Sequence, residues 1–404
     1  MSTSLLYHSF GVRGYRHVGT TFQGGRTIFR IEQDPQTLRC PQCRSSSVIR
    51  RGQWLRRFRT VPIGRRPVLV ELPVQRVQCR SCGAVRQVKV AFAEERRTYT
   101  RVFERYALEL SKRMTIKDVA AHLGLCWDVI KDMQKRHLTR RFAKPKLKKL
   151  SRIAIDEISI GHGQRYLTVV LDLASGAVVF VGQGRGSRVL DSFWRQLKAA
   201  GVHLQAVAMD MWPAYIAAVR THFPTAAIVF DHFHVVKLFN DKLSDLRREL
   251  QREATQGLHK KVLKGTRWLL LKNPEHLDEG RGERARLEEA LRVNQPLATA
   301  YYLKEDLRQF WQQPDKETAA AVLKDWIARA GASGVRMLKD FAKTLAAHRG
   351  GLLAYYDYPI STGPLEGTNT KIKVLQRQAY GFRDVEFFKL KIKALHETKY
   401  ALVG

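Results

Sequence analysis

The hydrophobic and polar positions in the first quarter of the chain follow the pattern of strands. Over residues 1–95, short apolar or basic runs such as 54–59 and 68–70 alternate with glycine and proline. Runs of this length between turn-forming residues favour β-strands. The sequence therefore predicts a module of short strands and turns, with breaks at Gly52, Pro62, Gly64, Pro67 and Pro73.

The apolar positions change to helical spacing from Tyr99 to about Arg141. Residues 115–130 contain a helix, a turn with Gly124 and a second helix, which is the order of a helix-turn-helix. A generic helical hairpin would give the same pattern. The basic run 144–149 contains a proline and predicts a linker. The second helix would present Trp127, Asp128, Lys131, Lys135 and Arg136 to a DNA groove or its phosphates.

A third pattern begins at Ser151, where three strand-like runs are followed by alternating helix and strand. This order predicts an α/β region with a mixed sheet. The next hundred or so residues are helical in pattern, and a last helical region begins near Ser361. The chain is therefore expected to be multidomain, with divisions at 1–95, 96–150, 151–239, 240–355 and 356–404.

The charge of the chain narrows its partners. The 404 residues include 71 lysines and arginines against 37 aspartates and glutamates, a formal net charge of +34. Residues 1–150 hold 33 basic and 10 acidic residues, and so about two thirds of that excess. A field of this size indicates a polyanionic partner, most simply double-stranded DNA.

Other features of the composition predict a cytoplasmic, nucleoid-associated protein that does not engage a membrane. No apolar run reaches the roughly 18 residues of a membrane span, and no basic-then-apolar leader is present. Five cysteines in a chain of this length do not make a disulfide scaffold, so a reducing compartment is expected.

Four of the cysteines form two Cys-x-x-Cys pairs, Cys40 with Cys43 and Cys79 with Cys82. Four thiolates can close a tetrahedral zinc site, and a closed site has a structural role. The 35 residues between the pairs exceed the commoner spacing of about 15–20. Strands in the gap could bring the pairs together, and four unrelated buried thiols are the alternative.

Three acids in the second half could hold a different metal. Asp156 lies within an apolar strand, Asp210 follows another strand, and Glu366 begins a late helix. A buried carboxylate is costly unless a cation neutralises it. Two aspartates on adjacent strands, joined by a glutamate, would suit Mg²⁺ and phosphoryl transfer. The pattern alone leaves open that these are ordinary surface or capping acids.

Four segments resemble a known family. Together and in this order they are similar to the DDE transposases of the ISL-three insertion-sequence family, over nearly the whole chain. The segments are Ala154-Ile155-Asp156-Glu157, Met209-Asp210-Met211-Trp212-Pro213-Ala214-Tyr215, Asp231-His232-Phe233-His234-Val235-Val236-Lys237 and Gly363-Pro364-Leu365-Glu366-Gly367-Thr368-Asn369.

The resemblance implies a ribonuclease-H-like core interrupted by a helical insertion, with Asp156, Asp210 and Glu366 as the catalytic triad. It extends to the tract 377–383, and three basic residues in this region are expected to contact DNA: Lys373, Arg377 and Arg383. Asp231 and His234 resemble a motif beside the active site of related transposases. They could orient ligands or DNA there, or form an internal pair that fixes a helix start.

The expected enzyme binds the terminal inverted repeats of its element, hydrolyses a phosphodiester and joins the 3′-hydroxyl to target DNA. It would use two Mg²⁺ ions, with Mn²⁺ as a substitute, and act as a homodimer on DNA. The alternatives are a DNA-binding regulator derived from a transposase and a metal-dependent nuclease. All three acids are present, which favours the enzyme.

Trp268 in the helical insertion has two interpretations. It lies close to Arg267 and Lys272 and could stack on an unpaired base of DNA. It could instead pack in the core with Leu269 and Leu270, and we predict that it is a core residue.

Overall fold

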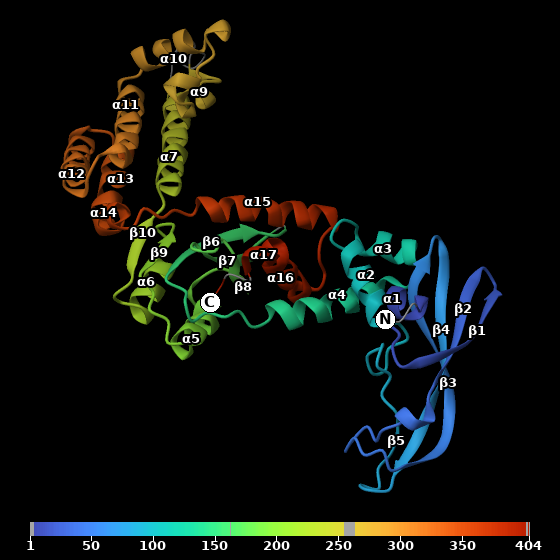
Figure 1. The fold of residues 1–404 in the computed structure, drawn as a ribbon. Helices are drawn as coiled ribbons and strands as arrows, with labels where there is room; N and C mark the ends of the chain where they lie inside the picture. The colour runs from blue at the N-terminus through green and yellow to red at the C-terminus, as the bar shows by residue number, and fades with distance from the viewer. Residues whose placement is uncertain (1–3, 162, 254–262, 401–402, 404) are drawn as a thin grey trace. The chain divides into compact units, whose positions relative to one another are not determined.

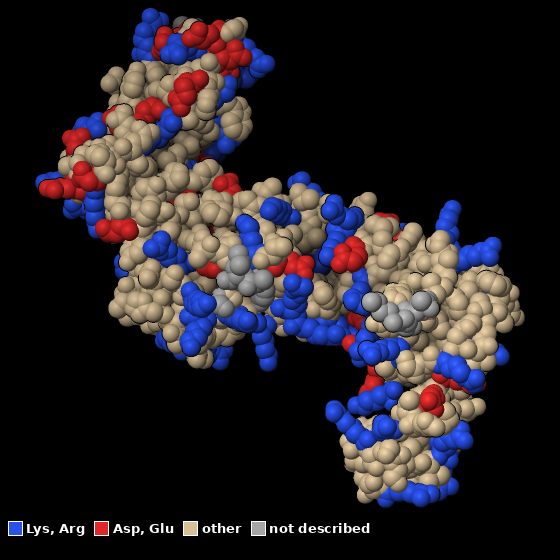
Figure 2. Space-filling model, viewed as in Figure 1, with Lys and Arg blue, Asp and Glu red and all other residues tan. Residues whose placement is uncertain are grey.

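The structure is a computed structural model that describes residues 4–161, 163–253, 263–400 and 403. The chain divides into two compact units, Met1–Arg141 and Phe142–Gly404 (Figure 1). In the part of the chain that is described, no helix is both long and apolar enough to cross a membrane. Basic side chains lie on both units, and acidic ones gather mainly on the helical insertion (Figure 2).

The first unit begins with a strand-rich module. Its order is β1-β2-β4-β3, with β4 antiparallel to β3 and parallel to β2, and β5 pairs with the other end of β4. Phe10, Phe58 and Val70 are buried at its core. The elements are α1 (Leu5–Phe10), β1 (Tyr15–Gln23), β2 (Arg26–Gln33), η1 (Pro35–Thr37), β3 (Val48–Ile63), β4 (Arg66–Cys79) and β5 (Val85–Gln87).

The prediction of short strands was wrong, because β3 and β4 form one long hairpin. Gly52 and Pro62 do not end a strand; each lies at a shift of register, where a β-bulge accommodates a residue that cannot pair regularly. Pro73 lies in β4 between the stretch paired with β2 and the stretch paired with β5, and Pro67 lies near the start of β4. Gly64, with φ +55°, forms the hairpin turn as predicted.

Three helices complete the first unit: α2 (Arg101–Leu110), α3 (Ile116–Leu123) and α4 (Trp127–Phe142). Thr100 and Thr115 cap α2 and α3 by accepting backbone hydrogen bonds from the third residue of each helix. Gly124 ends α3 in the left-handed conformation, with φ +60°. The helices share a core that includes Phe103, Val119, Ile130 and Met133.

The second unit is built on a mixed sheet, as predicted, with the order β10-β9-β6-β7-β8. β6, β9 and β10 are parallel to one another, whereas β7 is antiparallel to β6 and β8. The strands are β6 (Arg152–Ser159), β7 (Tyr166–Asp172), β8 (Val178–Gln183), β9 (Ala206–Met209) and β10 (Ala227–Phe230).

Each face of this sheet has its own core, since alternate side chains of a strand point to opposite faces. Ile153, Ile155 and Val207 belong to the cluster that includes η2 (Ser187–Leu190), α5 (Asp191–Ala199) and α6 (Pro213–His222). Ala154 and Ala208 belong to the opposite cluster, with residues of α15 (Gly363–Gln378) and α16 (Val385–Lys393). The last elements described are η6 (Ala394–His396) and α17 (Glu397–Tyr400).

A helical insertion separates β10 from α15. Phe239, Trp326 and Phe341 are buried together at its centre. Its elements are α7 (His232–Glu253), α9 (Arg267–Leu271), η3 (Pro274–His276), η4 (Glu279–Arg281), α10 (Glu283–Arg292), α11 (Gln295–Gln309), η5 (Phe310–Gln312), α12 (Lys316–Ala332), α13 (Arg336–Ala347) and α14 (Arg349–Asp357).

One close contact brings the chain back against the edge of the sheet. A Cβ atom at Gly351 of α14 would lie 2.3 Å from the ring of Phe230 on β10, and that ring is buried. We predict that Gly351→Ala lowers the melting temperature. Overpacking a filled core typically costs about 1–3 kcal/mol, more than the roughly 1 kcal/mol that alanine gains over glycine in a helix.

Gly350→Ala is the matched control, because nothing lies within 4 Å of a Cβ atom at that position. Its melting temperature should equal or exceed that of the wild type. If both variants melt alike in a thermal scan, the close packing of α14 on β10 is contradicted.

Candidate active site and zinc centre

The register of the parallel strands brings three aspartates to one level of the sheet. Ala154 of β6 pairs with Ala208 of β9, and Asp156 and Asp210 each follow two residues later. Asp156 on β6 therefore lies at the level of Asp210, which directly follows the end of β9, and neighbouring strands are about 4.8 Å apart. Phe230 of β10 pairs with Met209, so Asp231 stands at the same level on the next strand.

Asp156 and Asp210 share the face of Ala154 and Ala208, the face that α15 covers. Burial raises the pKa of both carboxyl groups above its ordinary value. The charge of Asp210 adds to the rise at Asp156, whereas the neighbouring His234 side chain acts to lower the pKa of both carboxyl groups. Two half-buried carboxylates in electrostatic contact make this end of the sheet a place that favours a cation.

Helix α15 is fixed to the acids at two points. The side-chain amide of Asn369 donates to Asp156 Oδ2 at 2.8 Å, and the backbone amide of Thr362 donates to Asp231 Oδ1 at 3.1 Å. Glu366 lies between these points in sequence, one turn before Asn369 and on the same side of the helix. The helix therefore holds Glu366 close to the level of the aspartates.

The three carboxylates do not converge to within 4.8 Å of one another in the described chain, unlike the four cysteines. Their donor set nevertheless fits magnesium, which takes oxygen ligands and usually keeps several waters. Asp156 has further partners that limit its movement: its Oδ1 accepts from the Glu157 amide at 2.7 Å. The side chain is thus positioned before any ion is bound.

Asp231 and His234 have different roles in the structure. Asp231 is buried, and its Oδ2 accepts from the His234 amide at 3.3 Å, which caps the start of α7. Its other oxygen holds Thr362, so Asp231 acts as a brace between β10, α7 and α15. The imidazole of His234 lies close enough to influence Asp156 and Asp210 electrostatically.

The sequence analysis assigned no role to several residues at this site. The Tyr215 hydroxyl donates to Glu157 Oε1 at 2.6 Å and lies 3.0 Å from Thr168 Oγ1. This chain of polar groups holds Glu157 beside the aspartates, and burial raises the pKa of that carboxyl. Asn369 was also missed, although its position three residues after Glu366 places both on one side of a helix.

The two cysteine pairs come together at the open end of the long hairpin. Val48 pairs with Cys79, so the chain just before β3 lies beside the end of β4. Cys40 Sγ lies 3.7 Å from Cys82 Sγ, and Cys43 Sγ lies 3.5 Å from Cys79 Sγ. Around a tetrahedral zinc ion with Zn–S bonds of about 2.3 Å, the sulfurs would be about 3.8 Å apart. The cluster therefore fits a structural zinc ion, and the hairpin accounts for most of the 35-residue gap.

Backbone amides support the thiolates of this cluster. The amide of Cys82 donates to Cys79 and lowers the pKa of that thiol to about 6. The amide of Cys43 lowers the pKa of Cys40 in the same way. Each pair lies in a tight turn that ends in a left-handed residue, Arg44 with φ +62° and Gly83 with φ +70°.

The sequence of the whole chain matches known proteins over the same regions. A family model described as a transposase matches residues 153–392. The helix-turn-helix domain of transposase family ISL3 matches residues 88–138, and the zinc-finger of the transposases IS204/IS1001/IS1096/IS1165 matches residues 36–82. The chain belongs to the ISL3 family of transposases.

Individual relatives agree with this assignment. The transposase for insertion sequence element IS1001 of Bordetella parapertussis is 34% identical over 377 residues, which is 92% of each chain. The transposase for IS1557 of Mycobacterium tuberculosis is 32% identical over 396 residues, covering 89% of this chain and 86% of the relative. A solved Drosophila P element transposase strand transfer complex aligns loosely, at a TM-score of 0.37 and 12% identity, over 63% of this chain and 79% of that one.

The family resemblance is thereby confirmed. The ISL3 chain is a DDE-type DNA transposase with a zinc ribbon and a helix-turn-helix domain that binds DNA. These matches do not favour the alternative interpretations, a generic helical hairpin for residues 115–130 and four unrelated thiols for the cysteines.

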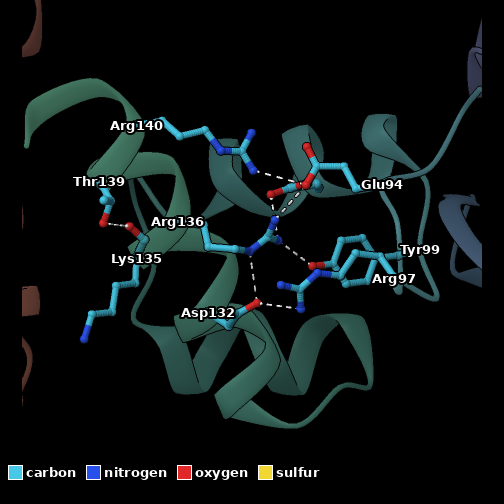
Figure 3. A network of polar contacts seen from close by, with 9 residues as sticks. Glu94, Arg97, Tyr99, Asp132, Lys135, Arg136, Thr139 and Arg140 are labelled. Carbon is cyan, nitrogen blue, oxygen red and sulfur yellow. Dashed lines mark hydrogen bonds and ion pairs between the residues drawn. The ribbon is translucent and has the colours of Figure 1, made fainter. Parts of the chain in front are cut away.

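The side chains expected to meet DNA from α4 are not equivalent. Trp127 is exposed at the start of the helix, and Lys131 Nζ lies 5.7 Å from the centre of its ring. Lys135 is half-buried. Arg136 points into the unit, where its guanidinium is used by internal partners (Figure 3).

The partners of Arg136 come from three parts of the first unit. Its nitrogens lie 3.0 Å from Glu94 and from Glu104, and 3.1 Å from Asp132. It also donates to the Tyr99 hydroxyl at 2.6 Å. The structure therefore gives Arg136 an internal role, fixing α4 to α2 and to the segment before α2.

The prediction that Trp268 is a core residue was wrong. Leu269 and Leu270 are buried as expected, but the Trp268 ring is 64% exposed. The guanidinium of Arg267 lies 4.9 Å from the centre of that ring. A five-residue helix buries only one side, and the two leucines occupy it.

Removal of a cysteine ligand tests the zinc centre. Cys40→Ser or Cys79→Ser should release the metal and weaken DNA binding, because a structural zinc site contributes its binding energy to folding. Metal analysis of the purified full chain should find about one zinc ion in the wild type and none in these variants.

Cys126→Ser is the matched control, since Cys126 is an exposed thiol outside the cluster. It should retain its zinc. A wild-type protein without zinc, or full zinc content in Cys79→Ser, would contradict the four-cysteine site.

Proposed function

We propose that the second unit contains a ribonuclease-H-like core, formed by 151–239 and 356–404, with 240–355 inserted into it. The support is topological. Three sequential strands, β6, β7 and β8, form antiparallel pairs, and β9 and β10 add parallel strands on the other side of β6. The first strand of the region is thus central, and the acids lie where its neighbour β9 ends.

In this proposal Asp156, Asp210 and Glu366 are the catalytic triad. Two observations carry this proposal. The register of β6 and β9 brings Asp156 and Asp210 to one level, and the hydrogen bond from Asn369 to Asp156 fixes the helix that bears Glu366. Bound by these oxygens, two magnesium ions, or manganese in their place, would stabilise charge on the attacking and leaving oxygens of a phosphodiester. Burial raises the pKa of both aspartates, and the charge of Asp210 adds to the rise at Asp156. A bound cation would relieve both effects.

Residues of α7 and the end of β10 support the aspartates of the proposed triad. Lys237 on α7 places positive charge near Asp156, and the imidazole of His234 lies on the first turn of the same helix. Asp231 uses both of its oxygens to hold backbone amides and so keeps β10, α7 and α15 together. Because DNA phosphates are the reacting groups, positive charge at this position helps to bind the scissile strand.

The reaction we propose is cleavage at the terminal inverted repeats of the element, followed by attack of the freed 3′-hydroxyl on target DNA. Water breaks the first phosphodiester and leaves the 3′-hydroxyl. That hydroxyl then forms a new phosphodiester as a target bond breaks, so no covalent protein–DNA intermediate is required. The zinc ribbon and α4 would recognise the ends, and a homodimer would hold one end on each copy.

Side chains of α4 and of the insertion extend the DNA contacts in this proposal. Trp127, Lys131 and Lys135 would contact the ends from α4. The exposed Trp268, beside Arg267, would contact DNA from the insertion.

Conservative substitutions test the triad. Asp156→Asn, Asp210→Asn and Glu366→Gln should each reduce cleavage of an end-containing duplex by at least about a hundredfold, the scale on which one charge-stabilising group acts. Binding of the same duplex should stay near normal, because phosphate contacts elsewhere dominate affinity.

Asp191→Asn, which changes an exposed acid at the start of α5, should cleave at the wild-type rate. Wild-type cleavage by any of the three site variants would overturn the assignment. A wild-type protein that binds ends but never cleaves them, with Mg²⁺ or Mn²⁺ present, would indicate a regulator instead.

A further inference from the structure

Helix α15 presents a continuous exposed stripe that begins at Glu366. Its members are spaced alternately four and three residues apart, so they lie along one side of the helix. The neighbouring side of the helix, with Leu365 and Ile372, is buried on the sheet. The exposed members are Glu366, Thr370, Lys373, Arg377 and, just past the end of the helix, Tyr380.

Tyr380 ends this stripe in an unusual conformation. Its φ is +52°, and its side chain is 99% exposed. A helix commonly ends in a left-handed residue, but that residue is usually glycine because a Cβ atom is disfavoured there. Here Gly381 comes one residue later, with φ +94°. The chain thus holds a tyrosine in a strained position where its ring gains nothing from packing, and strain of this kind is typical of functional sites.

The segment that carries Tyr380 is firmly held. The Tyr380 amide donates to Arg377 O at 3.0 Å, and the Gly381 amide donates to Gln376 O at 2.9 Å. The Phe382 ring stacks on Phe388 with 4.4 Å between ring centres. The backbone that carries the tyrosine is therefore held by a closed helix end and an aromatic anchor, and the segment is not a loose loop.

The charges beside the ring fit nucleic acid. Lys373, Arg377 and Arg383 are exposed, and within the described chain none of them is engaged by a carboxylate. This differs from Arg136, which three carboxylates surround. Basic side chains over α15 are visible in Figure 2. Unengaged basic groups on either side of an exposed aromatic ring suit a backbone and a base of the same strand.

We propose that the α15 stripe lies along the DNA that leaves the cleavage site, and that the Tyr380 ring stacks on a base about six base pairs from the scissile phosphate. The distance follows from the helix: fourteen residues at about 1.5 Å each give about 20 Å from Glu366, or six steps of about 3.4 Å. The ring acts as a wedge that unstacks one step. This inference rests on the proposed position of Glu366 at the cleaved phosphate.

Variants of the full chain separate stacking from strain. The probe is a 40-base-pair duplex that ends in the repeat flanking the gene. Tyr380→Ala and Tyr380→Gly should weaken its binding by about 5- to 100-fold, the usual effect of removing one base-stacking ring. Tyr380→Phe should bind like the wild type. Tyr380→Gly should also melt no lower than the wild type, because glycine tolerates the conformation.

Tyr302→Ala is the matched control, since it removes another exposed tyrosine ring, on α11. It should bind the duplex normally. Unchanged binding by both Tyr380→Ala and Tyr380→Gly, or equal loss in Tyr302→Ala, would overturn the proposal.

A scan with 2-aminopurine locates the stacked base. The probe base is moved one position at a time along a pre-cleaved duplex, bound by an Asp156→Asn protein so that no chemistry intervenes. Its fluorescence should change about four to eight base pairs from the cleaved end, and Tyr380→Ala should remove the change. If the fluorescence depends on Tyr380 at no position of the duplex, the stacking proposal is overturned, even where the triad variants behave as proposed.

The same scan distinguishes the two proposals from each other. A Tyr380-dependent signal more than about twelve base pairs from the end would overturn the placement along α15. Wild-type cleavage by Glu366→Gln would instead overturn the proposed triad and leave the stacking measurement intact.

Discussion

One hydrogen bond joins the two ends of the catalytic region. The Asn369 amide donates to Asp156 across 213 residues of sequence, and the position of α15 on the sheet depends on it. That bond ties the helix of Glu366 directly to one of the aspartates. The hydrogen bond also uses an oxygen of a half-buried carboxylate, so it selects one orientation of Asp156.

Three contacts lead the chain to that point after the long insertion. Gly351 first brings α14 against Phe230 at the edge strand β10. Asp231 then receives the Thr362 amide at the end of the same strand. Asn369 reaches Asp156 on β6, two strands further in. These three contacts fix where the chain rejoins the sheet, so the length of the insertion does not affect the position of α15.

In the first unit, different interactions hold distant parts of the chain together. A hairpin as long as β3 and β4 would separate its ends from the rest of the module, but the four cysteines close those ends. The Arg136 network then fixes α4 to α2 and to the segment before it. In both units, polar side chains such as Arg136 and Asp231 hold helices and strands in place. Other side chains on those elements are the ones proposed to contact DNA or a metal ion.

The sequence was informative where chemistry and spacing act locally. The two Cys-x-x-Cys pairs, the capped helices and the apolar strands ending at Asp210 and Asp231 are visible in the order of residues. The long hairpin was not, because Gly52 and Pro62 break strands in most contexts and only the bulges show that they do not do so here. Trp268 was misjudged for a similar reason, since its neighbours Leu269 and Leu270 already fill the buried side of a short helix.

Tertiary partners also lay beyond the sequence. Arg136 on a recognition helix has the residue type of a DNA contact, and only the positions of Glu94 and Glu104 show that it serves the fold. Asp231 was weighed together with His234 because the two residues are close in sequence. Its second oxygen in fact holds Thr362, 131 residues away, which no local pattern could indicate.

Direct binding of Mn²⁺ to the full chain tests the central claim, that Asp156 and Asp210 together form an oxygen-ligand metal site. Electron paramagnetic resonance measures the free ion without requiring DNA or catalysis. The account predicts that the wild type binds Mn²⁺ and that the double variant Asp156→Asn, Asp210→Asn does not, while its zinc content and melting transition are retained. Mn²⁺ binding by a folded double variant with wild-type affinity would contradict it.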